Sequence, residues 1–202
     1  IQDDLMDYSI EKVLDFLERR KKYLDGVCIT GGEPLLSLDI DFIEKIKAMG
    51  YKIKIDTNGG FPDKLNELIN ENLVDYVSMD IKACPDKYSE VAGIDVDLNK
   101  IEESIKLISK LENFEFRTTL LYKFHDKDCF RKTMDWLKRI INSEDASSES
   151  LIKKGRFVLQ GFKKRDKMID MGFSNEPNFN EKDAIVLKDI AKEYFNEVVV
   201  KI

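Results

Sequence analysis

The sequence predicts an α/β fold in which helices cover a parallel β-sheet. Short runs rich in β-branched and aromatic residues alternate about six times with longer segments whose apolar residues recur at helical spacing. This alternation is typical of βα units, because parallel strands need a crossover connection, which is usually a helix. Periodicity does not decide between an open sheet and a barrel. With 202 residues, of which 43% are apolar, the chain suits a single domain, 1–202, with a substantial core.

Each helix expected in the first half of the chain has a boundary residue of a usual kind. Side chains that accept hydrogen bonds from free N–H groups begin helices, proline suits the first turn, and glycine ends them. The boundary residues are Ser9 and Lys22 for the first helix, Asp39 or Asp41 and Gly50 for the second, and Pro62 for the third. The strands expected among these helices cover 27–30, 51–55 and 73–81.

The second half of the chain repeats this pattern. The expected strands cover 114–121, 156–162 and 197–202, and apolar stripes predict helices over 101–111, 130–141 and 182–195, the last capped by Asn180. The stretch "NSEDASSES" is small and polar, and it predicts a mobile surface loop at 142–154.

Charge and composition exclude several classes of protein. The chain has 33 basic and 39 acidic residues and a net charge of −6, whereas a nucleic-acid-binding protein needs a basic surface. No apolar run has the length that a bilayer requires, and we expect a cytoplasmic protein that contacts neither nucleic acid nor membrane.

The cysteines and the single histidine carry little functional signal. Cys28, Cys84 and Cys129 are odd in number and far apart, so we expect thiols in a reducing compartment and no disulfide framework. His125 has no neighbouring cysteine or histidine, and we expect it in a surface loop.

Polar or glycine-rich clusters follow three successive expected strands. They read "TGGEP", "DTNGG" and "MDIK". The carboxyl ends of parallel strands meet at one edge of the sheet, where α/β proteins bind ligands. One such cluster alone is typical of a turn, but three in series predict a ligand site.

The residue types in these clusters suit a polar, charged ligand. The glycines of "TGGEP" permit positive φ angles and close approach of the backbone, while Glu33 is expected to brace the loop or bind a cation. On a period-2 count Asp56 shares a strand face with Lys54, and Asp80 shares one with Lys82. These pairs are either local ion pairs of small value or part of a charged site.

Arg117 is the candidate for binding an anionic group. In "FEFRTTLL" it points away from Phe114 and Phe116 on the alternation of a strand. A guanidinium there can bind a carboxylate through two parallel hydrogen bonds. The alternative is a structural ion pair with Glu115 or Glu102.

Several segments together resemble one enzyme family. They are "GVCITGGEPLL", "IKIDTNGG", "VDYVSMDIKACPDKYSEVAG", "FEFRTTLLYKFHD" and "RFVLQGF". In order and spacing they resemble radical S-adenosylmethionine enzymes, especially the glycyl-radical-enzyme activases, and among these the activating protein of anaerobic ribonucleoside-triphosphate reductase. The resemblance covers the chain from about Ser9 to Phe162.

The resemblance implies a fold, cofactors and partners. The expected fold is α/β, a partial parallel (β/α)6 barrel of TIM-like type, with S-adenosylmethionine and a [4Fe–4S] cluster at the carboxyl ends of the strands. The expected reaction is reductive cleavage of S-adenosylmethionine to a 5′-deoxyadenosyl radical, which makes a glycyl radical on a partner enzyme. That partner would be a glycyl radical enzyme such as anaerobic ribonucleotide reductase, with an electron donor such as flavodoxin or ferredoxin.

The resemblance also implies roles for individual residues. The methionyl amino group would be held by Gly31, Gly32, Glu33 and Pro34. Arg117 would meet the methionyl carboxylate, and Lys82 and Asn58 would lie near the ribose. A monovalent cation would be held by Asp56, Thr57 and Asp80. No side chain is expected to act as acid or base.

One feature of the family is missing from this sequence. The cluster is expected on a C-x3-C-x2-C motif before the first helix, and the three cysteines here have no such spacing. We expect a fragment that lacks the first strand and the cluster loop; a natural homologue without a cluster is the alternative.

Two other functions fit the same residues. One is a barrel hydrolase or lyase that uses a divalent metal held by Glu33, Asp56 and Asp80. The other is a non-catalytic module that binds a nucleoside or a protein. Within the radical family, another glycyl radical partner or a rearrangement of the queuosine pathway stays open.

Overall fold

The computed structural model describes residues 8–143, 154–164 and 175–202. Residues 144–153, which make up most of the loop predicted at 142–154, lie outside the described residues.

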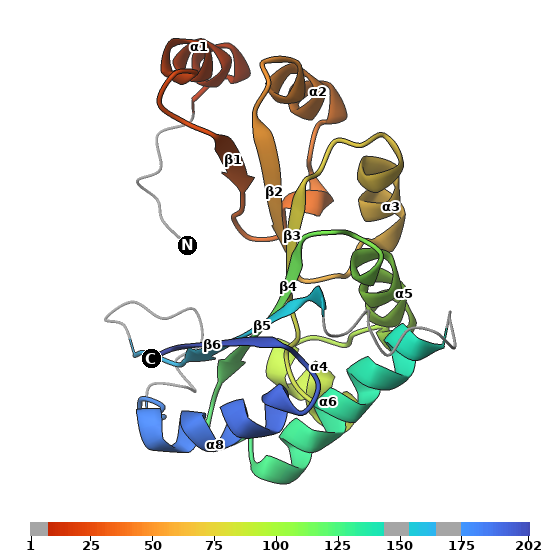
Figure 1. Ribbon diagram of the computed structural model, residues 1–202, viewed down its shortest axis with the longest axis vertical. Helices are drawn as coiled ribbons and strands as arrows, with labels where there is room; N and C mark the ends of the chain where they lie inside the picture. The colour runs from red at the N-terminus through yellow and green to blue at the C-terminus, as the bar shows by residue number, and fades with distance from the viewer. Residues whose placement is uncertain (1–7, 144–153, 165–174) are drawn as a thin grey trace.

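The fold is organised by a six-stranded parallel sheet whose strands lie side by side in chain order, β1-β2-β3-β4-β5-β6 (Figure 1). The strands are β1 (Gly26–Ile29), β2 (Lys52–Thr57), β3 (Tyr76–Asp80), β4 (Phe114–Leu120), β5 (Arg156–Gly161) and β6 (Glu197–Lys201). Each described strand pairs with its chain neighbours, so that β1 and β6 are the two edges and the sheet is not closed. The predicted α/β class with a partial parallel barrel is confirmed.

Helices cover the convex side of the curved sheet, and the concave side is open in the described part of the chain (Figure 1). They are α1 (Ile10–Arg20), α2 (Ile40–Ala48), α3 (Pro62–Asn70), α4 (Tyr88–Ala92), α5 (Leu98–Ser109), α6 (Lys127–Asn142) and α8 (Glu181–Lys192), with the 3-10 turns η1 (Pro34–Leu36) and η2 (Pro85–Lys87). The predicted caps Ser9, Asp39 and Asn180 accept hydrogen bonds from the first turns of α1, α2 and α8. The short helix α4 was not predicted.

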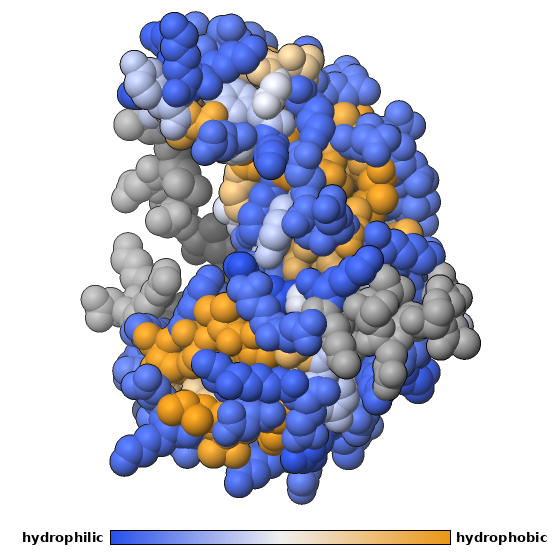
Figure 2. Space-filling model, viewed as in Figure 1, coloured by the Kyte–Doolittle hydropathy of each residue, from blue (hydrophilic) through white to orange (hydrophobic). Residues whose placement is uncertain are grey.

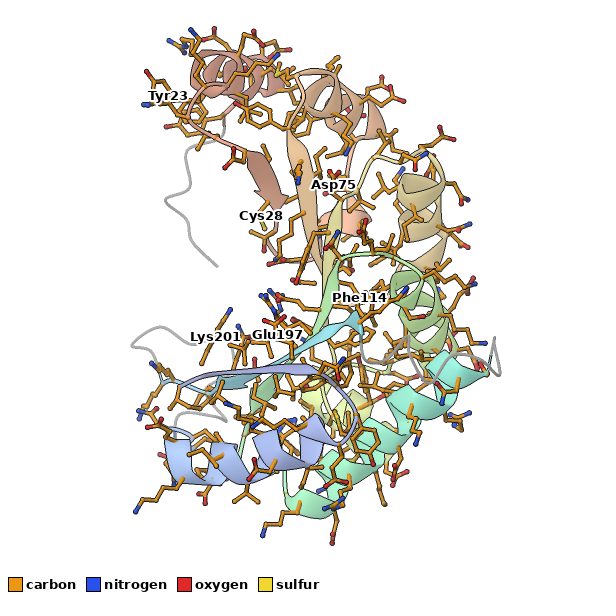
Figure 3. All side chains as sticks on the ribbon, in the orientation of Figure 1. Tyr23, Cys28, Asp75, Phe114, Glu197 and Lys201 are labelled. Carbon is orange, nitrogen blue, oxygen red and sulfur yellow. A yellow bond between two sulfur atoms is a disulfide. The ribbon has the colours of Figure 1, made fainter. Side chains whose placement is uncertain are left out.

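The two faces of the sheet differ in chemistry because side chains alternate along each strand. On the convex face Ile53, Ile55 and Val77 are fully buried against the helices. Burying an aliphatic side chain of this size contributes about 1.5–3 kcal/mol. The concave face carries charged residues instead, and Figure 3 shows Glu197 and Lys201 pointing from β6 into the space that the sheet curves around.

The outer surface in view is largely hydrophilic, and apolar side chains gather over α8 and β6 (Figure 2). No helix in the described part of the chain is both long and apolar enough to cross a membrane.

The prediction that all three cysteines are thiols is wrong. Cys84 and Cys129 form a disulfide, and Cys28 is free and exposed. The two bonded cysteines are 45 positions apart, and the fold alone brings the segment after β3 onto the first turn of α6.

The expectation of a surface position for His125 is also wrong, because this residue is only 4% exposed. Its Nδ1 accepts a hydrogen bond from the N–H of Leu121 at 3.0 Å, and its Nε2 lies 2.8 Å from the carbonyl oxygen of Lys82. Burial lowers the pKa of His125, which fits a neutral ring that donates from Nε2. His125 therefore ties the loop after β4 to the loop that carries Lys82.

Candidate functional site

The carboxyl ends of β1, β2, β3 and β4 meet at a cavity of about 560 Å³. Eight of the ten predicted site residues line it: Gly31, Gly32, Asp56, Thr57, Asn58, Asp80, Lys82 and Arg117. They come from four separate strand ends, which a parallel sheet places at one edge. Eight of the residues that the sequence assigned to one site at this edge therefore lie around one cavity.

The two remaining residues, Glu33 and Pro34, stand behind the glycine loop. Pro34 begins the 3-10 turn η1, and the Glu33 carboxylate accepts three hydrogen bonds. The donors are the N–H of Leu35 at 3.3 Å, the hydroxyl of Thr57 at 2.8 Å and the N–H of Asn58 at 2.6 Å. Glu33 thus joins the loop after β1 to the end of β2.

The turn after β2 depends on a glycine. Gly59 has a φ of +80°, and a Cβ at this position would lie 2.0 Å from the terminal methyl carbon of Met79. The turn is closed from within, because the Thr57 hydroxyl accepts from the N–H of Gly59 and the Asn58 side chain accepts from the N–H of Gly60. A larger residue at Gly59 would be strained by this positive φ even if the Met79 side chain moved aside.

A chain of five alternating charges crosses the floor of the site, and we call it the rim cluster. Its members in spatial order are Lys54, Asp56, Arg117, Asp80 and Lys82. The Arg117 guanidinium lies between the two carboxylates: its NH1 donates to Oδ2 of Asp56 at 2.9 Å, and its Nε donates to Oδ1 of Asp80 at 2.9 Å. Lys82 pairs with Asp80 at 3.0 Å, and Lys54 pairs with Asp56. Three cations and two carboxylates leave a net charge of +1.

These contacts shift the pKa values at the centre of the rim cluster. Burial alone would raise the pKa of Asp56, but hydrogen bonds from Lys54 and Arg117 outweigh it and hold this pKa below its ordinary value. Burial alone would lower the pKa of Arg117, yet the carboxylates of Asp80 and Asp56 raise it. Both groups are therefore charged at neutral pH.

The far wall of the cavity is a part of the site that sequence reasoning missed. It consists of the segment from α4 to the start of α5, including Tyr88, Ile94 and Lys100. Ile94 is 68% exposed, and the Tyr88 hydroxyl donates to the carbonyl oxygen of Asp80 at 3.3 Å. Gly93, which ends α4 in the left-handed region with a φ of 72°, is the one local signal that could have revealed this helix.

The described residues do not offer a metal or cluster site of the usual kind. No group of three or more His, Cys, Asp or Glu side chains within 8–143, 154–164 and 175–202 is placed to hold a metal ion. The three cysteines do not fit a [4Fe–4S] cluster, since two are bonded to each other and Cys28 stands alone. The alternative divalent-metal enzyme gains no support, because Glu33 faces Thr57 and Asn58 instead of Asp56 and Asp80.

Comparison with known proteins defines the class to which this fold and site belong. Residues 2–137 match the model of the Radical SAM superfamily. A domain of the pyruvate-formate lyase-activating enzyme from Bacteroides vulgatus has the same fold, with a TM-score of 0.63 and 18% identity over 87% of this chain and 98% of that domain.

Two proteins of Methanocaldococcus jannaschii, each named "Putative glycyl-radical enzyme activating enzyme", are similar in sequence. One is 32% identical over 195 residues, which span 93% of this chain and 73% of the relative. The other is 29% identical over 138 residues, which span 64% of this chain and 52% of the relative. The chain belongs to the Radical SAM superfamily and, within it, to the family of glycyl-radical enzyme activating enzymes. Members of this family are oxidoreductases that depend on S-adenosylmethionine and an iron–sulfur cluster.

Proposed function

We propose that this chain forms the S-adenosylmethionine-binding part of an enzyme that generates a glycyl radical on an anaerobic ribonucleotide reductase. When bound and reduced, S-adenosylmethionine supplies a 5′-deoxyadenosyl radical, and the protein contributes binding, orientation and exclusion of water. Flavodoxin or ferredoxin is the class of electron donor that we propose. The family membership and the motifs "TGGEP", "DTNGG" and "MDIK" support this proposal.

One observation carries the proposal: Gly31 and Gly32 line the same cavity as four members of the rim cluster, which are Asp56, Arg117, Asp80 and Lys82. The cavity wall carries cations, among them Arg117 and Lys82, and further carboxylates at Asp95 and Asp97, which suits a ligand with charges of both signs. Backbone freed of side chains at Gly31 and Gly32 suits a ligand that must come close to the main chain. The cavity, at about 560 Å³, is within the range of small-molecule sites. A zwitterionic methionyl group joined to a nucleoside has the charge, the small polar head and the size that this cavity suits.

The residues divide the ligand among them in the following way. Main-chain groups of Gly31 and Gly32 bind the methionyl amino group, and Glu33 and Pro34 hold the loop that presents them. Arg117 meets the methionyl carboxylate from the floor of the cavity. Asn58 and Lys82 lie beside the ribose, and the wall from α4 to α5 is left to cover the adenine.

Calorimetric titration of the chain with S-adenosylmethionine tests this assignment. We expect saturable binding that Arg117→Ala and Lys82→Ala each weaken by about tenfold or more, which corresponds to about 1.4 kcal/mol. The matched control is Arg156→Ala, which removes an arginine from the same face of the sheet but outside the cavity. Circular dichroism of each variant establishes that it is folded.

Two outcomes would contradict the assignment. One is the absence of binding to the wild-type chain at millimolar S-adenosylmethionine. The other is binding that Arg156→Ala weakens as much as Arg117→Ala does. The partner is tested separately, by anaerobic co-expression of the gene product with a ribonucleotide reductase and detection of the glycyl radical by electron paramagnetic resonance. If the co-expressed gene product carries a reducible iron–sulfur cluster, also detected by electron paramagnetic resonance, and no glycyl radical forms, this partner is rejected and the binding pocket stands.

A further inference from the structure

Both carboxylates of the rim cluster, Asp56 and Asp80, already pair with cationic side chains through each of their oxygens. Oδ1 of Asp56 accepts a hydrogen bond from Lys54, and Oδ2 accepts one from Arg117. Oδ1 of Asp80 accepts from Arg117, and Oδ2 accepts from Lys82. All four carboxylate oxygens thus face a nitrogen that belongs to the protein. Arg117 fills the space between the two carboxylates, and only 17% of its side chain is exposed.

Thr57, the third residue of the predicted cation site, is engaged as well. Its hydroxyl donates to Oε1 of Glu33 and accepts from the N–H of Gly59, and the residue is 3% exposed. A cation bound here would have to share this hydroxyl with Gly59 and lie close to Arg117.

Lys54 reaches Asp56 from below the cavity. It does not line the cavity itself but a separate hollow toward the amino ends of the strands, which Cys28 and Tyr76 also line. The ammonium lies 5.8 Å from the centre of the Tyr76 ring and 4.0 Å from the sulfur of Cys28. A ligand that fills the cavity would therefore not compete with Lys54 for its place.

We propose that Lys54 is a built-in counter-ion of Asp56, so that this pocket works without the monovalent cation that the family resemblance implies at Asp56, Thr57 and Asp80. Lys54 is then a positioning residue: it neutralises Asp56, which holds Arg117 between the two carboxylates. A further cation bound to Asp56 and Asp80 would lie close to the three protein cations that already pair with these carboxylates, which are Lys54, Arg117 and Lys82, and they would repel it. The proposal concerns the pocket of the proposed function and rests on it, but it can be tested without S-adenosylmethionine.

The test compares thermal unfolding of the chain in sodium, potassium and choline chloride at equal ionic strength. We expect the wild-type chain to have the same Tm in all three salts. Lys54→Met leaves Asp56 short of one cation, and we expect its Tm to rise by about 2–4 °C, saturably, in sodium or potassium relative to choline. Lys54→Arg keeps a cation in place and should behave as the wild type does.

Lys52→Met is the matched control, because Lys52 lies on the same strand and face, and its loss changes the net charge equally. The proposal is overturned if the wild-type Tm depends on the cation in a way that Asp56→Asn abolishes. It is also overturned if the Tm of Lys54→Met responds to cations no more than that of Lys52→Met does.

Should Lys54→Met fail to fold, sodium NMR decides the question. Broadening of the sodium line by the wild type beyond that caused by Asp56→Asn overturns the proposal, and equal line widths support it. Failure of the proposed function would appear as lost S-adenosylmethionine binding, which these measurements do not involve.

Discussion

The concave face of the sheet carries two charge networks with opposite designs. The rim cluster has more cations than carboxylates and opens into the cavity. The second network lies toward the amino ends of the strands and consists of Tyr76, Ser78, Glu115, Arg156 and Glu197. At its centre the Glu115 carboxylate, 8% exposed, accepts from the Ser78 hydroxyl at 2.5 Å and the Tyr76 hydroxyl at 3.2 Å.

The difference between the two networks separates a binding role from a structural one. In the second network the Ser78 and Tyr76 hydroxyls both donate to Glu115. Its two carboxylates, Glu115 and Glu197, outnumber its one cation, Arg156, so the network does not attract an anion. In the rim cluster the cations Arg117 and Lys82 lie at the wall of a cavity that a ligand can enter. Alternating charges on one sheet face are therefore not enough to identify a site, and the adjoining cavity is what distinguishes the rim cluster.

The strongest test of this distinction is Glu115→Ala. It leaves the fully buried Ser78 hydroxyl without its acceptor, and we expect the free energy of unfolding to fall by about 3 kcal/mol. Binding of S-adenosylmethionine should not change in the folded fraction. Urea unfolding and calorimetric titration measure the two quantities.

Glu115→Gln is the control for this experiment. It keeps an acceptor for Ser78 and should lose only about 1 kcal/mol. If Glu115→Ala weakened S-adenosylmethionine binding as strongly as Arg117→Ala, the two networks would be one functional unit, and the comparison would fail.

The sequence predicted the elements and the edge of the site because both follow from local patterns. Alternation of strand and helix identified all six described strands, and the clusters after β1, β2 and β3 fall at the cavity. The caps at Ser9, Asp39 and Asn180 are local signals too, since a cap depends only on the first turn that follows it.

The partners of the side chains could not be predicted, because strand register decides them. Asp80 lies opposite Arg117 in the pairing of β3 with β4, and Ser78 lies opposite Glu115. A register shifted by two residues would have given Arg117 the partner Ser78 and left Asp80 without it. The alternative pairing of Arg117 with Glu102 also fails, because Glu102 accepts from Trp136 and Arg139.

A smaller effect is expected from acid, and it should be confined to the rim cluster. The pKa of Asp56 is lowered in the folded chain, so its ion pairs stabilise the fold above the unfolded value of about 4 and are lost as the pH falls through the folded pKa. We expect Asp56→Asn to cost about 1–2 kcal/mol at pH 7. The difference in the free energy of unfolding between Asp56→Asn and the wild type should disappear as the pH falls below about 4. Urea unfolding at a series of pH values measures this difference. A difference that does not depend on pH would show that the charge of Asp56 is not the source of the stability that its contacts with Lys54 and Arg117 provide.

The smallest effect belongs to the second network and appears at the opposite end of the pH scale. Burial and the nearby Glu115 carboxylate raise the pKa of Tyr76 to about 12, above the value of about 10 in an unfolded chain. A raised pKa means that the folded state holds the proton more tightly, so the stabilisation is complete below pH 10 and is lost between pH 10 and about 12.

Tyr76→Phe removes the hydroxyl that donates to Glu115, at a cost of about 0.5 kcal/mol at pH 8, and it removes this alkaline loss as well. The other six of the seven tyrosines are common to both proteins, so the difference between the two unfolding curves isolates Tyr76. Curves that stay parallel up to pH 12 would mean that Glu115 does not depend on the Tyr76 proton. Curves that converge would show that the Tyr76 proton supports the second network at alkaline pH, whereas the rim cluster loses the Asp56 charge only in acid.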